Sequence, residues 1–62
     1  MSTAQTDYQA RQARIEALGQ QLQAKLASHD TKAAAQPGNW GFAGDLGHIE
    51  ARLQELVDFI RD

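Results

Sequence analysis

The side chains best suited to chemistry in this chain are two histidines with charged neighbours. His29 is followed by Asp30, while His48 comes three residues after Asp45 and four before Arg52. These spacings predict structural roles: a local hydrogen bond between His48 and Asp45, and contact of His29 with the negative end of a helix dipole. Neither histidine belongs to a recognisable constellation of nucleophile, base or metal ligands, and the chain has no cysteine to supply a thiolate. We therefore expect no enzymatic activity, no cofactor and no metal.

The segment from Pro37 to Gly47 is the most unusual part of the sequence, because Trp40 and Phe42 stand among glycines spaced three residues apart. Glycine permits backbone conformations with positive φ, so the spacing predicts a compact turn that packs both rings onto the helices. The alternative is that Trp40 and Phe42 anchor a partner macromolecule, as tryptophan often does at interfaces. A phosphate-binding loop is disfavoured, since no Lys or Arg lies in the segment.

A second helix is predicted over about 45–60, with Asp45 as its N-cap. Its large apolar residues recur at spacings of three and four, which places them on one face of an α-helix. This face is our candidate for self-association, and it comprises Leu46, Ile49, Leu53, Leu56 and Ile60.

A first helix is predicted over about 6–29, with Thr6 or Asp7 as its N-cap. Its apolar stripe is narrower and consists of Tyr8, Ile15, Leu18, Leu22 and Leu26. Residues 1–5 are then expected to form a disordered tail, and residues 31–44 a long connecting loop.

Three basic residues of the first helix support an alternative function in nucleic-acid binding. Arg11 and Arg14 lie about one turn apart, and in a dimer they could form a basic strip with Lys25. The length and predicted shape are similar to those of Rop, an RNA-binding dimer of helical hairpins, although only the architecture is shared. The net charge of -2 and the pI near 5.5 oppose this alternative.

The residues from Asn39 to Leu46, Asn-Trp-Gly-Phe-Ala-Gly-Asp-Leu, followed by an amphipathic helix, resemble a signature of small bacterial proteins. These proteins are largely uncharacterised and are often carried on plasmids or other mobile elements. The resemblance covers the last third of the chain and brings no catalytic residues with it. It implies a bacterial, cytoplasmic accessory protein of a mobile element.

Sixty-two residues form at most one domain, here 1–62, and bury too little surface for a stable core without disulfides, metal or self-association. The sequence therefore predicts an all-α, two-helix hairpin whose homodimer forms a four-helix arrangement, parallel or antiparallel. The predicted function is protein-protein interaction or assembly, with a second copy and a larger protein as partners. The start of the chain lacks the features of a secretory signal and no apolar run is long enough to span a membrane, so we expect a cytoplasmic location.

Overall fold

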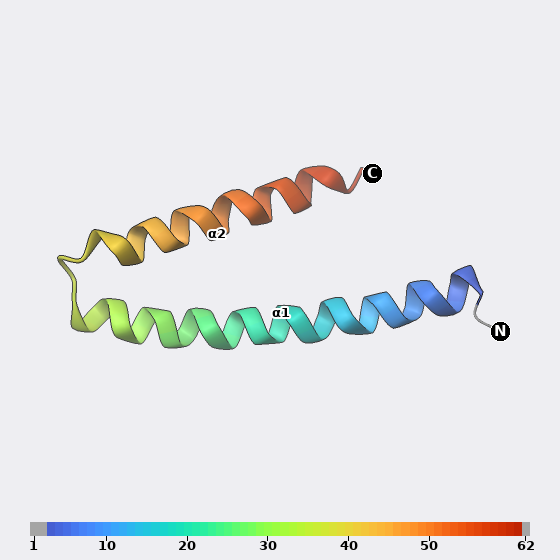
Figure 1. Cartoon of the computed structure of the whole chain (residues 1–62), viewed down its shortest axis with the longest axis horizontal. Helices are drawn as coiled ribbons and strands as arrows, with labels where there is room; N and C mark the ends of the chain where they lie inside the picture. Colours follow the sequence, from blue (N-terminus) through green and yellow to red (C-terminus); the bar gives the residue numbers. More distant parts are fainter. Residues whose placement is uncertain (1–2, 62) are drawn as a thin grey trace. The chain divides into compact units, whose positions relative to one another are not determined.

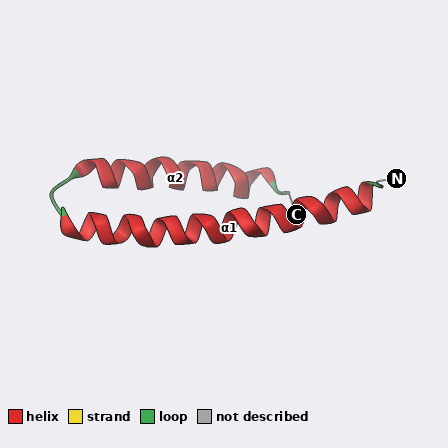
Figure 2. Cartoon of the chain, turned by 60° about the horizontal axis from the view of Figure 1, so that its bottom comes forward, coloured by secondary structure: helices red, strands yellow, loops and turns green. Residues whose placement is uncertain are grey.

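A computed structural model of the chain describes residues 3–61 and contains two α-helices (Figures 1 and 2). Helix α1 spans Ala4–Ala35 and helix α2 spans Trp40–Phe59, with no strand among the described residues. The described residues form two units that divide between Thr31 and Lys32. The second unit holds the last turn of α1, the connection and α2. The all-α prediction is confirmed.

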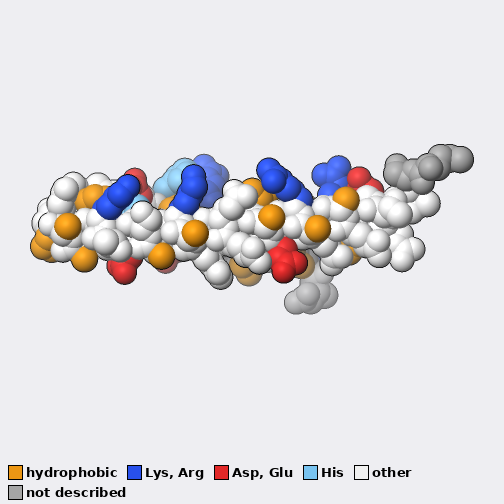
Figure 3. All heavy atoms as spheres, turned by 90° about the horizontal axis from the view of Figure 1, so that it is seen from below, with side chains coloured by type: hydrophobic (Ala, Val, Ile, Leu, Met, Phe, Trp, Pro, Cys, Tyr) orange, Lys and Arg blue, Asp and Glu red, His pale blue; other side chains and the backbone are white. Residues whose placement is uncertain are grey.

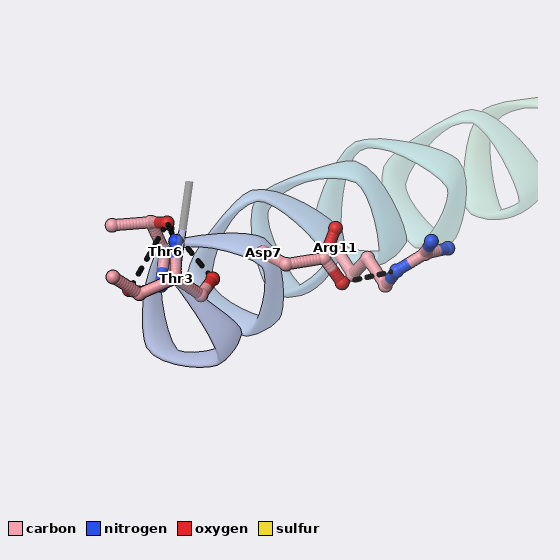
Figure 4. Close-up of polar contacts among 4 residues, drawn as sticks. All are labelled: Thr3, Thr6, Asp7 and Arg11. Atoms are coloured by element: carbon pink, nitrogen blue, oxygen red, sulfur yellow. Dashed lines mark hydrogen bonds and ion pairs between the residues drawn. The ribbon is translucent and has the colours of Figure 1, made fainter. Parts of the chain in front are cut away.

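Helix α1 begins at a reciprocal cap made by two threonines (Figure 4). The Thr6 backbone N–H donates to the Thr3 hydroxyl at 3.1 Å, and the Thr3 N–H donates to the Thr6 hydroxyl at 2.8 Å. This arrangement satisfies two backbone donors at the helix start, as a capping box does. Asp7 follows in the first turn, at the positive end of the helix dipole. The prediction of Thr6 or Asp7 as N-cap was therefore wrong, because Thr3 holds that position.

The disordered tail predicted over residues 1–5 was wrong for Ala4 and Gln5. Ala4 and Gln5 are helical, and Thr3 caps them. The remaining part of the prediction concerns Met1 and Ser2, which lie outside the described residues.

Helix α1 continues six residues beyond its predicted end at His29 and stops at Ala35. Residues 31–35 include three consecutive alanines, which favour helix, and Thr31 donates its hydroxyl to the Ala27 carbonyl at 3.2 Å. Pro37 restricts the preceding residue and cannot continue the helix. The loop predicted over 31–44 was therefore wrong at its start.

The connection between the helices consists of residues 36–39 and contains a β-turn. The Asn39 N–H donates to the Gln36 carbonyl at 3.0 Å, and Pro37 stands at the second turn position, where its fixed φ is favourable. No glycine among the described residues has a positive φ. The prediction that glycines fold the turn through positive φ was wrong.

Helix α2 begins five residues before the predicted start because Asn39, not Asp45, is its N-cap. The Asn39 side-chain oxygen accepts from the Gly41 N–H at 2.9 Å, and its amide group donates to the Gln36 side chain at 3.2 Å. An N-cap asparagine satisfies donors that have no partner inside the helix. Three of the glycines assigned to the turn therefore lie inside the helix: Gly41, Gly44 and Gly47.

No hydrophobic side chain among residues 3–61 is buried, so the described chain has no core of its own. The residues of intermediate exposure lie mainly in the part of each helix that is nearer in sequence to the connection: Ala17, Leu22, Leu26, His29, Ala33, Phe42 and Ile49. Large apolar residues nearer the chain ends are exposed: Tyr8, Ile15, Leu18, Leu53, Leu56, Val57, Phe59 and Ile60.

Candidate interaction surfaces

The predicted self-association face is a continuous surface of α2. At 3.6 residues per turn, Leu46, Ile49, Leu53 and Leu56 fall within an arc of about 80°, and Val57 extends this arc by about 20°. Ile60 follows directly as the extended C-cap residue, with φ -80° and ψ 115°. We call these six residues the α2 apolar face.

Exposure along the α2 apolar face rises toward the end of the helix. Leu46 and Leu53 are 46% and 41% exposed, whereas Leu56 and Ile60 are 61% and 71% exposed. Burial of this exposed apolar surface by a partner contributes about 25 cal/mol per Å² to the free energy of binding. The surface can therefore contribute binding energy along its whole length, most of all in its last two turns.

Trp40 and Phe42 do not form a joint patch. They are the first and third residues of α2, which sets them about 160° apart around the helix. Phe42 falls within the arc of the α2 apolar face and is half-buried, while Trp40 lies on the far side and is 85% exposed. The expectation that both rings are packed was wrong for Trp40.

Small residues surround Trp40 on its side of α2. Ala43, Gly44 and Gly47 follow at helical spacing, and a Cβ added at either glycine would meet nothing within 4 Å. Because Trp40 and the α2 apolar face lie on opposite sides of α2, a partner that covers one of them leaves the other exposed. The two predicted interactions therefore use different faces of the same helix.

Arg11 and Arg14, which were predicted to contact nucleic acid together, do not have equivalent surroundings. The Arg11 Nε donates to the Asp7 carboxylate at 2.8 Å, and both side chains are largely exposed (Figure 4). Such an i,i+4 pair contributes only about 0.3–0.5 kcal/mol to stability. Its larger effect is to neutralise Arg11 locally.

The basic residues of α1 nevertheless share one side of the helix. Arg11, Arg14, Lys25 and Lys32 fall within an arc of about 60°, and Figure 3 shows basic side chains following one edge of the face that it presents. Sequence reasoning placed Lys32 in a loop and so did not join it to this group. We call these four residues the α1 basic strip.

The two histidines have different surroundings from those predicted. His29 lies inside α1 and is half-buried, and His48 lies beyond the second turn of α2 instead of in the first. Among residues 3–61, no three His, Cys, Asp or Glu side chains gather as a metal site would require. Two polar contacts within α2 join Arg52 to Glu55 at 3.0 Å and Gln54 to Asp58 at 2.9 Å.

Neither α1 nor α2, over the residues that the structure describes, has the length and apolarity needed to cross a membrane. No protein-family model, curated protein or solved structure matches the chain.

Proposed function

We propose that this protein is a non-enzymatic assembly module that pairs with a second copy of itself through the α2 apolar face. The observation that carries the proposal is the absence of any buried hydrophobic side chain among residues 3–61, together with the exposed apolar row on α2. A helix that exposes such a row is normally covered by another element or by a partner.

The accessible surface supports a partner of substantial size. The chain exposes 5828 Å², whereas a folded monomer of 6.8 kDa exposes about 4000 Å². A compact dimer of this mass would expose about 6600 Å², so packing of the helices within and between the two chains would remove about 5000 Å² in total. Interfaces of obligate homodimers bury about 2000–5000 Å², which makes a second copy a sufficient occupant.

The arrangement we propose for the pair is a four-helix bundle built from two antiparallel hairpins. Short connections such as residues 36–39 favour antiparallel neighbours in helical proteins, and two hairpins supply the four helices. The α2 apolar face would then form most of the shared core, with the narrower stripe of α1 completing it.

Trp40 is the proposed contact for a larger protein partner. Its exposure of 85% and its position across α2 from the apolar face support a role that is independent of self-association. A tryptophan in the centre of an interface often contributes more than 2 kcal/mol to binding. The resemblance of residues 39–46 to small mobile-element proteins supports placing this module in the bacterial cytoplasm, as an accessory factor.

Sedimentation equilibrium over a wide range of protein concentration tests the self-association. We expect a species of about twice 6.8 kDa at micromolar concentration and a melting temperature that rises with concentration. A cooperatively folded monomer with concentration-independent melting would refute the proposal. The Trp40 contact is tested separately with Trp40→Ala, which should keep the dimer while losing partner proteins that the unchanged chain captures.

A further inference from the structure

We propose that the α1 basic strip binds the phosphate backbone of duplex nucleic acid. The strip comprises Arg11, Arg14, Lys25 and Lys32, all on one helix that runs without a break from Ala4 to Ala35. This inference does not depend on the α2 apolar face, because each single chain carries a complete strip.

The length of the strip matches a duplex. Twenty-one residues separate Arg11 from Lys32, which at 1.5 Å per residue is about 32 Å of helix. One turn of B-form DNA is about 34 Å long. Over this length α1 can follow one side of a duplex for about one turn.

Two polar residues that border the arc suit a phosphate ligand. Gln21 and Ser28 lie about 20° and 40° outside the arc, between the basic residues along the helix, and both can donate hydrogen bonds to phosphate oxygens. Leu18 and the half-buried His29 lie within the arc, and Leu18 also belongs to the apolar stripe of α1. The charged and polar donors predict contacts to the phosphate backbone instead of base readout.

With one exception, the acidic side chains of α1 do not neutralise the positive charge of the α1 basic strip. Glu16 and Asp30 lie about 100° or more from its nearest residues, across a helix about 10 Å wide, and salt near 0.1 M screens charges over that distance. Asp7 is the exception, because it lies within the arc and holds Arg11 at 2.8 Å. Arg14, Lys25 and Lys32 are then the principal phosphate contacts, and Asp7 limits the affinity.

An anionic membrane is a less suitable ligand for α1. Helices that lie on membranes carry a broad apolar face with bulky aromatic residues, whereas α1 has a narrow stripe with Tyr8 as its one aromatic. The stripe is also bordered by basic residues on one side only, since Asp30 lies beyond the other.

Fluorescence anisotropy with labelled 20-base-pair DNA and RNA duplexes tests the proposal. We expect a dissociation constant on the order of 10⁻⁵ M at 50 mM salt. Three phosphate contacts give a slope of log affinity against log salt of about -2.7, so affinity should fall about 40-fold between 50 and 200 mM. The two duplexes distinguish B-form from A-form ligands, and two strips on one duplex would double the slope.

Two pairs of substitutions with the same loss of charge locate the contact. Arg14→Gln with Lys25→Gln should weaken binding at least tenfold and reduce the slope by about 1.8. The control, Arg52→Gln with Arg61→Gln, removes two charges from outside the strip and should leave the slope unchanged. Asp7→Asn should strengthen binding and steepen the slope by about 0.9, because it releases Arg11.

Four results would overturn the proposal: no binding of either duplex at 50 mM salt, equal weakening by both pairs of substitutions, tighter binding of a single strand, or binding of phosphatidylserine vesicles in place of duplex. Circular dichroism of each variant should retain the helical signal, which separates loss of contact from loss of fold.

Discussion

Replacement of Leu56 by alanine gives a quantitative test of the α2 apolar face. Leu56 is 61% exposed in the described chain, and full burial of a leucine side chain contributes about 2 kcal/mol relative to full exposure. Covering its remaining exposed part therefore contributes about 1 kcal/mol per copy. Because a symmetric dimer carries the change twice, Leu56→Ala should cost about 2 kcal/mol and raise the dimer dissociation constant about 30-fold.

Trp40→Ala is the matched control for this test. Trp40 is more exposed than Leu56, at 85%, but lies on the far side of the same helix. Sedimentation equilibrium with interference optics, which does not depend on tryptophan absorbance, should show an unchanged dissociation constant. If Trp40→Ala weakens the dimer as much as Leu56→Ala, or if Leu56→Ala has no effect, the assignment of the α2 apolar face is wrong.

The helix starts provide further predictions, each measured by urea unfolding followed by circular dichroism. Asn39→Ala removes the cap of α2 and should lower the free energy of unfolding by about 1 kcal/mol; an unchanged value would contradict this role. Thr3→Ala should have a smaller effect, because it breaks one side of the reciprocal cap with Thr6 at the end of the chain. Gly44→Ala should raise stability by about 0.5–1 kcal/mol, since an added Cβ meets nothing within 4 Å. Gly41→Ala should gain less, because its Cβ would lie 3.0 Å from the Asn39 Oδ1; equal gains at both glycines would contradict the cap geometry.

The periodic parts of the sequence predicted their structure well. The spacing of Leu46, Ile49, Leu53 and Leu56 identified one face of α2 because the period of an α-helix depends only on backbone geometry. The recurrence of apolar residues at spacings of three, four and seven also identified α1. In both helices, the spacing of the apolar residues was sufficient to predict an α-helix and its apolar side.

The helix ends and the Trp40 face were predicted poorly. Glycine at Gly41, Gly44 and Gly47 is compatible with a turn and, at a cost, with a helix, and the choice depended on the Asn39 cap, which sequence reasoning did not consider. Because α2 starts at Trp40, the helix geometry determines the side of α2 on which Trp40 lies. Residue propensities alone do not determine that side. Helix α1 likewise extends beyond its predicted end, so Lys32 lies on α1 and belongs to the α1 basic strip.

The three glycines inside α2 also bear on how long the protein survives in a cell. Each costs about 0.5–1 kcal/mol relative to alanine, and a helix of 20 residues is marginal by itself in water. We expect the first two turns of α2 to open locally in unpaired chains, with the fastest amide hydrogen exchange of either helix, and to become protected on self-association. Cellular proteases would then remove unpaired copies first. Turnover would in this way keep the protein present mainly in its assembled form.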